Sequence, residues 1–341
     1  MSAASTPPRT RLDVVGIGNA LVDVLSHESD DFIEEHGLAR GAMTLIDTER
    51  AEKLYAAMGP ATEISGGSAA NSMVGITSFG GAAAFVGRVS DDQLGSVFGH
   101  DIRAAGVEFT TAPAANAEHA GAPTGCCLII VTPDAQRTLN TFLGASAQLG
   151  PDDLDHHLIA RAQVLFLEGY LWDEQDAKEA FRRAARTAHD AGNRVAFTLS
   201  DGFCVERHRD EFLDLVEQEV DVLFANEVEI TSLYQVDSFD AALQNVQHHC
   251  EIAALTRSEK GAVIVGRDEI HVVDAHPVDK IVDTTGAGDL FAAGFLYGLT
   301  HGYDLGTAGR LGACAASEVI SHLGARPERS LRELAGPLLR D

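Results

Sequence analysis

The residues best suited to chemistry lie near the C-terminal end, in the sequence DTTGAGD at positions 283–289. Gly286, Ala287 and Gly288 leave backbone N–H groups open to a ligand, and the apolar run after them is long enough for a buried helix. A helix N-terminus presents unpaired donors and a partial positive charge, so it can hold a phosphate without a basic side chain. Asp289 falls in the first turn, where this field should keep it ionised and able to take a proton from an attacking hydroxyl.

Glycines before a helix can also serve only as a tight turn, and a bare Gly-x-Gly would favour that interpretation. The longer string here resembles the signature of the ribokinase-like, or PfkB, family of sugar and nucleoside kinases. The resemblance implies that Gly286, Ala287 and Gly288 form an anion hole and that Asp289 is the catalytic base. It also implies ATP and Mg²⁺ as cofactors. The Walker sequence GxxxxGK[ST] is absent from the chain.

A second glycine-rich sequence, ISGGSAAN at positions 64–71, runs into an apolar stretch that predicts another helix. The glycines allow close backbone approach, and the Asn71 amide offers both a donor and an acceptor. This sequence is similar to the first signature of the same family, which contacts the hydroxyls of the acceptor sugar. The resemblance therefore assigns Gly66, Gly67, Ser68 and Asn71 to acceptor binding.

The first predicted strand, at residues 12–17, leads into Asn19 and Asp23. Ligands of α/β folds bind at the carboxyl ends of strands, although Asn and Asp are also common turn residues. The sequence GNALVD at positions 18–23 resembles the GNPLLD of the adenosine kinase branch of the family. That resemblance implies that Asn19 and Asp23 bind a nucleoside ribose.

Two further stretches resemble adenosine kinases. Arg137 opens a sequence similar to a lid segment whose arginine counters phosphate charge as the lid closes. Tyr170 aligns with an aromatic residue that stacks on the purine, so the resemblance implies Tyr170 as the base platform. The sequence SDGF at positions 200–203 departs from the Ser-Ala-Pro-Phe of the family. This departure leaves guanosine, inosine or a free sugar open as acceptors.

Asn226 and Glu229 follow a predicted strand and would lie on one face of a helix. Such a pair can be only a capping box, in which each side chain satisfies the other residue's backbone N–H. It is also similar to the NxxE motif of the family, whose glutamate orients water around nucleotide-bound Mg²⁺. Since Mg²⁺ keeps several waters and takes few protein carboxylates, we favour the magnesium role. The resemblance also places Thr256 and Gly261 at the nucleotide.

Asp283 and Thr285 correspond to residues that supply oxygens to K⁺ in family members with a monovalent-cation site. Side-chain capping of the loop is the alternative, and the sequence leaves both open. Histidine pairs at residues 156–157 and 248–249 have no matching carboxylate or cysteine cluster. We therefore expect solvated surface histidines rather than zinc ligands.

From residue 164 onward, predicted strands and helices alternate. Strands are expected at residues 164–168, 195–199, 222–225, 252–256 and 262–265, and helices at residues 174–191, 210–218, 228–233 and 240–250. This alternation indicates right-handed βαβ crossovers and a mostly parallel sheet with helices on both faces. The predicted fold class is α/β, ribokinase-like, with a small β-sheet lid.

The lid is predicted from short strands that cannot enclose a core of their own. They lie at residues 21–25, 41–46, 126–131 and 137–141. Such a sheet suits a lid that closes on a ligand and excludes water. We predict a large nucleotide-binding domain from residues 1–20, 47–60, 66–107 and 143–341, and a small lid from residues 21–46, 61–65 and 108–142.

The chain has 51 acidic and 25 basic residues, a net charge of −26. A surface this acidic repels nucleic acid and anionic lipid, so we expect neither as a partner. Five cysteines without CxxC spacing favour free thiols in a reducing compartment. Residues 1–11 hold no apolar signal core, and no run reaches the roughly 18 apolar residues of a membrane span. We expect a cytoplasmic protein, either a monomer or a homodimer.

Together these features predict an ATP-dependent phosphotransferase that acts on a ribose-type primary hydroxyl, with adenosine to AMP as the first choice. A ribokinase- or fructokinase-type sugar kinase, or a guanosine or inosine kinase, is the alternative. A non-catalytic nucleotide-binding regulator is disfavoured because such a protein needs neither Asp289 nor Glu229.

Overall fold

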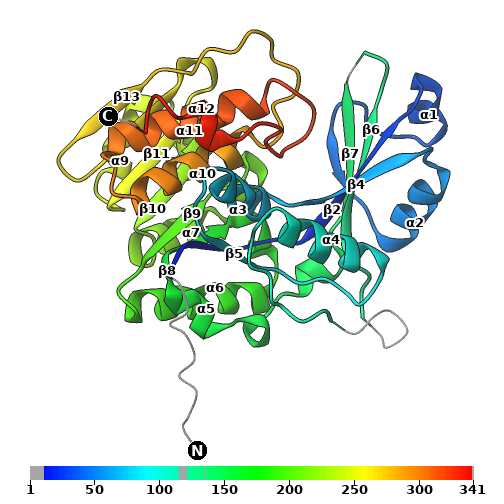
Figure 1. Ribbon diagram of the computed structural model, residues 1–341, viewed down its shortest axis with the longest axis horizontal. Coiled ribbons are helices and arrows are strands. Elements are labelled where there is room, and N and C mark those ends of the chain that lie inside the picture. Colours follow the sequence, from blue (N-terminus) through cyan, green and yellow to red (C-terminus); the bar gives the residue numbers. More distant parts are fainter. Residues whose placement is uncertain (1–10, 115–120, 135, 340–341) are drawn as a thin grey trace, which may run out of the picture.

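The elements of the chain form two β-sheets of different size, as the computed structural model shows for residues 11–114, 121–134 and 136–339 (Figure 1). The larger sheet has eight strands in the order β13-β12-β11-β10-β9-β8-β1-β5, and the smaller has five in the order β3-β7-β6-β2-β4. Residues 1–10, in which we looked for a signal core, lie outside the described residues.

The large sheet contains every strand that the alternating pattern predicted. Its strands are β1 (Leu12–Ile17), β5 (Ala83–Val86), β8 (Ala162–Glu168), β9 (Arg194–Thr198), β10 (Val222–Asn226), β11 (Ile252–Thr256), β12 (Ala262–Val265) and β13 (Ile270–Val273). The strands from β5 to β11 pair in parallel, and β12 and β13 add antiparallel pairs at one edge. The mostly parallel α/β sheet is therefore confirmed.

Helices cover both faces of this sheet, so neighbouring residues of one strand belong to different cores. Val14 and Phe166 pack with α3 (Ser68–Ser78), α10 (Ala287–Thr300) and α11 (Leu305–Val319). Val15 and Leu165 pack in a second core. The helices of that core are α5 (His156–Arg161), α6 (Gln175–Asp190), α7 (Gly202–Gln218), α8 (Glu227–Tyr234) and α9 (Phe239–Val246). Strands buried on both faces explain the near-continuous apolar runs that made them visible in the sequence.

The small sheet stands to one side of the large sheet and carries further helices (Figure 1). Its strands are β2 (Leu21–His27), β3 (Met43–Leu45), β4 (Ala61–Gly66), β6 (Gly125–Val131) and β7 (Arg137–Phe142). The helices α1 (Asp30–Glu35), α2 (Thr48–Ala57) and α4 (Gln93–Ala104) accompany it, and α12 (Leu331–Leu334) follows α11 at the C-terminal end. The division of the chain into a large domain and a lid stays our proposal, with these five strands as the lid.

One predicted boundary is wrong. The helix expected at residues 210–218 begins at Gly202. The sequence around residue 201 is typical of a loop, but the Asp201 side chain accepts a hydrogen bond from the Cys204 N–H and starts the helix there. The early start brings a kink at His208, where the backbone leaves helical geometry.

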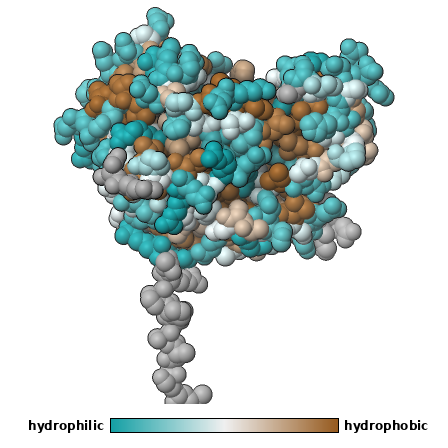
Figure 2. All heavy atoms as spheres, turned by 45° about the horizontal axis from the view of Figure 1, so that its top comes forward, coloured by the Kyte–Doolittle hydropathy of each residue, from teal (hydrophilic) through white to brown (hydrophobic). Residues whose placement is uncertain are grey.

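The surface mixes polar residues with scattered apolar ones (Figure 2). The exposed large apolar side chains include Met43 and Leu45 on the edge strand β3, and Ile270 and Val272 on the edge strand β13. No helix in the described part of the chain has both the length and the apolar character needed to cross a membrane.

Candidate active site

The anion-hole sequence lies at the N-terminus of α10, as predicted. Gly286 is the N-cap and has a left-handed backbone, with φ +78°. A Cβ built there would lie 2.8 Å from the Cα and Cβ of Ala325, so this position takes only glycine. A Cβ at Gly288 would meet nothing within 4 Å. The space beside Gly288 is therefore open, whereas the Ala287 N–H already donates to the Thr284 carbonyl (3.2 Å).

Asp289 joins the two glycine-rich sequences. Its Oδ1 accepts a hydrogen bond from Ser68 Oγ (2.6 Å), and its Oδ2 accepts one from Asn71 Nδ2 (3.0 Å). Ser72 Oγ also donates to the Asp289 carbonyl (3.0 Å), which ties α3 to α10. Ser68 and Asn71 precede Asp289 in the chain by 221 and 218 positions, and both side chains bind its carboxylate.

The prediction for Asp289 considered only the field of the helix, and burial acts against that field. Burial raises the pKa of the Asp289 carboxyl, and this effect exceeds the lowering by its hydrogen bonds to Ser68 and Asn71 and by the charge of Arg326. The physical reason is the packing of α3 against α10, which removes part of the carboxyl surface from water. A raised pKa brings the group closer to neutral pH, where a general base works best.

Asn19 and Ala69 are held by a carboxylate that the sequence did not single out. Glu168, at the end of β8, is fully buried. Its Oε1 accepts from the Asn19 N–H (2.7 Å) and Nδ2 (3.0 Å), and its Oε2 accepts from the Ala69 N–H (2.7 Å). Burial raises the pKa of Glu168 to about 7, although these hydrogen bonds lower it. Glu168 therefore fastens the two acceptor-binding segments to each other.

Asp23 lies beneath the second glycine-rich sequence. A Cβ at Gly66 would lie 2.6 Å from both oxygens of Asp23, and one at Gly67 would lie 2.1 Å from the Asn19 carbonyl oxygen. Burial raises the pKa of Asp23 to about 6, and the charge of Asp289 raises it further, against the lowering by two arginines. Two partly buried carboxyls, those of Asp23 and Asp289, thus share the region between the small sheet and α10.

Arg137, the predicted lid arginine, reaches the anion-hole loop. Its Nη1 lies 2.7 Å from Asp283 Oδ2, and each of the two side chains is 7% exposed. Arg137 Nε and Nη2 are buried without a hydrogen-bond partner. A buried guanidinium with two unused donors is suited to an anion.

The hydrogen bonds of the Asp283 carboxylate decide whether this side chain could bind the predicted K⁺ ion. Its Oδ1 accepts from the Thr285 N–H (3.1 Å) and Oγ (2.8 Å). Its Oδ2 accepts from the Gly324 N–H (2.9 Å) as well as from Arg137. Four donors use the lone pairs of both oxygens, so this side chain does not fit a cation ligand in the arrangement seen. The loop-capping alternative describes the geometry of Asp283 and Thr285.

Asn226 and Glu229 form a reciprocal capping box at the start of α8. Glu229 Oε2 accepts from the Asn226 N–H (2.9 Å), and Asn226 Oδ1 accepts from the Glu229 N–H (2.9 Å). Burial raises the pKa of Glu229 to about 7. Asn226 Nδ2 donates to Oε1, so each carboxylate oxygen accepts one hydrogen bond and keeps a lone pair for a water. The pair therefore caps the helix and also fits a water-mediated Mg²⁺ site.

Of the other two predicted nucleotide residues, Thr256 ends β11 and Gly261 directly precedes β12. Thr256 pairs with Asn226 in the register of β10 and β11, so the two lie side by side. Gly261 has a left-handed backbone, with φ +81°, and a Cβ there would lie 2.0 Å from the Val273 carbonyl oxygen. A tight turn therefore accounts for Gly261. Among the described residues no group of three or more His, Cys, Asp or Glu side chains could hold a metal ion.

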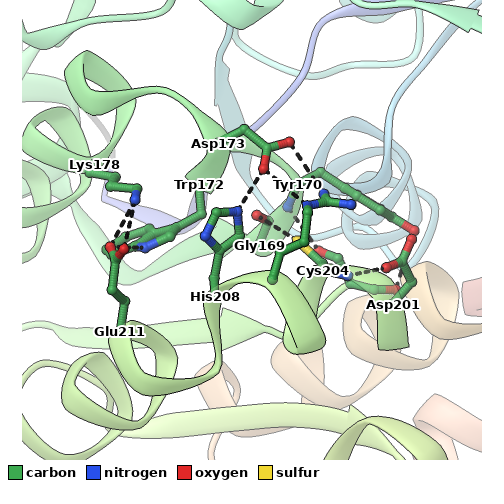
Figure 3. A network of polar contacts seen from close by, with 11 residues as sticks. Gly169, Tyr170, Trp172, Asp173, Lys178, Asp201, Cys204, His208 and Glu211 are labelled. Carbon is green, nitrogen blue, oxygen red and sulfur yellow. Dashed lines mark hydrogen bonds and ion pairs between the residues drawn. The ribbon is translucent and has the colours of Figure 1, made fainter. Parts of the chain in front are cut away.

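Tyr170 lies in a turn that is fastened to α7 (Figure 3). Its N–H donates to Ser200 Oγ and its hydroxyl donates to the Ser200 carbonyl, both at 3.3 Å. Burial raises the pKa of the Tyr170 hydroxyl, and the charges of Asp289 and Glu229 add to the effect.

The rest of the same turn explains why Tyr170 is held firmly. Trp172 is fully buried, and its Nε1 donates to Glu211 Oε2 (2.8 Å). Asp173 contacts His208 Nε2 at 2.6 Å, and Cys204 Sγ donates to the Gly169 carbonyl at 3.2 Å (Figure 3).

One arginine of the site was missed from the sequence. Arg326 Nε donates to Asn71 Oδ1 (2.7 Å), and Arg326 Nη2 donates to Ser65 Oγ (3.0 Å). Its local sequence, GARPERS, offers no spacing that would have indicated a site.

Comparisons with known proteins agree with this geometry. A family model described as pfkB family carbohydrate kinase matches residues 42–331. Among curated proteins, a 5-dehydro-2-deoxygluconokinase of Geobacillus kaustophilus is 26% identical over 321 residues, which cover 91% of this chain and 88% of that protein.

Two solved structures are similar over nearly their whole length. A probable sugar kinase protein from Rhizobium etli is 50% identical, with a TM-score of 0.88 and coverage of 96% of this chain and 98% of that chain. The adenosine kinase from Sinorhizobium meliloti is 49% identical, with a TM-score of 0.87 and coverage of 96% and 99%.

Proposed function

The chain belongs to the pfkB family of carbohydrate kinases, and we propose that it transfers the γ-phosphoryl group of ATP to the 5′-hydroxyl of a nucleoside, with adenosine as the acceptor. Kinase activity on a sugar or nucleoside hydroxyl follows from the family. The acceptor and the residue roles are the proposal. They are supported by the meeting of both glycine-rich sequences at Asp289.

In the proposed mechanism Asp289 takes the proton of the acceptor hydroxyl as that oxygen attacks the phosphoryl group. Ser68 and Asn71 fix the direction of the carboxylate through their hydrogen bonds. The N–H groups at the start of α10, from Gly286 to Gly288, stabilise the charge on the transferred group.

The nucleotide and its metal are assigned to neighbouring groups. Mg²⁺, held through a water on Glu229, would neutralise triphosphate charge. Arg137 lies on the small sheet, and its two unused donors would bind the triphosphate and neutralise part of its charge. Asn19, Asp23 and Gly67 are assigned to the acceptor sugar.

The observation that favours a nucleoside over a free sugar is the composition of one face of the small sheet. The pairing register places Leu25, Cys127, Ile129 and Leu139 on the same face as Asp23. These four residues are apolar, and they form a cluster of their own. A flat purine can lie against such a surface, whereas the many hydroxyls of a free sugar would be left unpaired there.

A sugar or sugar-acid kinase is the second candidate. The similarity to 5-dehydro-2-deoxygluconokinases over 91% of the chain favours it. Under that alternative Asp289 and the anion hole keep their roles. The apolar face of the small sheet would then not contact the acceptor.

Measuring ADP release with ATP and Mg²⁺ over a panel of acceptors tests the proposal. The panel contains adenosine, guanosine, inosine, ribose, fructose and 5-dehydro-2-deoxygluconate. We expect a kcat/KM for adenosine at least about tenfold above every other acceptor, which corresponds to about 1.4 kcal/mol of transition-state discrimination. Turnover confined to a free sugar or sugar acid would reject the nucleoside, and no turnover on any of them would reject the proposed function.

A further inference from the structure

A loop that follows α11 packs against the anion hole from behind. The Gly324 N–H donates to Asp283 Oδ2 (2.9 Å), and Ala325 fills the space that a side chain at Gly286 would need. The next residue, Arg326, turns toward α3 and β4. Three consecutive residues thus contact both glycine-rich sequences.

Arg326 links four segments of the chain. Its Nε donates to Asn71 Oδ1 (2.7 Å) and its Nη2 donates to Ser65 Oγ (3.0 Å). Ser65 in turn donates from Oγ to Asp101 Oδ2 (2.6 Å) on α4. On the other side, Asn71 Nδ2 donates to Asp289 Oδ2 (3.0 Å). The guanidinium is therefore one residue away from the proposed base.

The Asn71 amide is held in one orientation by partners of opposite kind. Its oxygen faces a guanidinium donor, and its NH₂ group faces a carboxylate. A flipped amide would place oxygen against the carboxylate and NH₂ against the guanidinium, and both contacts would be repulsive. Once Asp289 has taken a proton, its own preference for the NH₂ group weakens, and Arg326 is the partner that keeps Asn71 in place.

We propose that Arg326 is a positioning residue for phosphoryl transfer, because through Asn71 it keeps the Asp289 carboxylate directed at the acceptor hydroxyl. The inference rests on the proposed function, in which Asp289 is the base. Arg326 is not assigned a contact with ATP or the acceptor.

The charges around the site agree with this role. Burial lowers the pKa of Arg326 only to about 10, so the side chain is charged at neutral pH. Its charge lowers the pKa of the Asp289 carboxyl and of the Asp23 carboxyl, which repel each other. The charge of Asp289 also raises the pKa of Glu168 and of the Tyr170 hydroxyl, so these groups share its electrostatic surroundings.

Replacing Arg326 tests the inference in steady-state kinetics. Arg326→Met keeps the length of the side chain but removes the donors and the charge, and Arg326→Lys restores only the charge. We expect kcat of the Met variant to fall by about one hundredfold, as for a misplaced catalytic group. The acidic limb of its kcat–pH profile should move up by about one pH unit, because the loss of a nearby positive charge raises the pKa of Asp289. The Lys variant should restore the limb but not the full kcat.

Arg329→Met serves as the matched control, since Arg329 lies on the same loop and is exposed. It should keep the wild-type kcat and pH profile. An Arg326→Met enzyme with wild-type kcat and an unmoved limb would overturn the inference. A fall in kcat with an unmoved limb and a lowered melting temperature would reduce Arg326 to a purely structural residue, which also overturns it.

A second measurement needs no acceptor and so separates this inference from the proposed function. Arg326 stabilises Asp23 and Asp289 only when they are ionised. The melting-temperature gap between wild type and Arg326→Met should therefore widen from about pH 5 to about pH 8. A gap that stays constant with pH contradicts the charge coupling, whereas failure of the wild type on every acceptor contradicts the proposed function alone.

Discussion

Replacing Glu168 by glutamine should change how the stability of this protein depends on pH. Burial raises the folded-state pKa of Glu168 from 4.5 to about 7. A shift of this size corresponds to about 3 kcal/mol. Because the folded pKa is the higher one, the contribution is fully present below pH 4.5 and is lost as the pH rises through about 7.

Urea-induced unfolding at several pH values would measure the effect. Between about pH 5 and about pH 8 the free energy of unfolding of the wild type should fall by about 2.5 kcal/mol more than that of Glu168→Gln. Asp23 and Glu229 also have raised pKa values, but they contribute equally to both proteins and cancel in the difference. Glu206→Gln, at an exposed position on α7, is the control and should follow the wild type.

The same replacement should disturb the acceptor site. Glutamine cannot accept the hydrogen bonds of Asn19 and Ala69 together, because its NH₂ group would face one of these donors. We expect KM for the acceptor to rise while KM for ATP stays close to the wild-type value. Identical pH slopes for wild type and Glu168→Gln would refute the reasoning, because they would mean that Glu168 carries no buried charge at high pH.

Three further substitutions test separate parts of the site. Gly67→Ala places a Cβ 2.1 Å from the Asn19 carbonyl oxygen and should raise the acceptor KM more than about tenfold. Gly192→Ala is the control: Gly192 has the same left-handed backbone, but a Cβ there meets nothing within 4 Å, so this variant should lose only stability. Equal acceptor KM values for the Gly67 and Gly192 variants would contradict a steric clash at Gly67. Arg137→Met should raise KM for ATP by about tenfold or more in initial-rate assays, and an unchanged value would remove Arg137 from the phosphate site. Glu229→Gln should raise the Mg²⁺ concentration for half-maximal rate several-fold with the acceptor KM unchanged, and an unaltered Mg²⁺ dependence would leave Glu229 as a helix cap only.

The strands and the anion hole could be predicted because their causes are local. Parallel strands buried on both faces are continuous apolar runs, and all of them except the short strand β5 were found within a residue or two of their observed ends. The start of α10 depends on Gly286, whose left-handed backbone only glycine adopts easily. The start of α7 was missed because a Ser-Asp-Gly sequence is equally typical of a loop and of a capped helix.

The side-chain partners of the site could not be predicted, because they are distant in the chain. Glu168 meets Asn19 across 149 positions, and Arg326 meets Asn71 across 255. Neither residue has a local pattern that distinguishes it from a surface charge. The direction of the pKa shift at Asp289 was missed for a related reason, since the helix field is visible in the sequence and the burial by α3 is not.

The most direct test of the central claim is to identify the product formed from ATP, Mg²⁺ and adenosine by the wild type and by Asp289→Asn. Asparagine keeps the shape of the side chain but cannot take a proton. We predict that ³¹P NMR shows AMP with the wild type, and that Asp289→Asn forms it at least about a thousandfold more slowly while still binding adenosine. Formation of AMP by Asp289→Asn at the wild-type rate would contradict Asp289 as the base, and ADP without AMP would contradict adenosine as the acceptor.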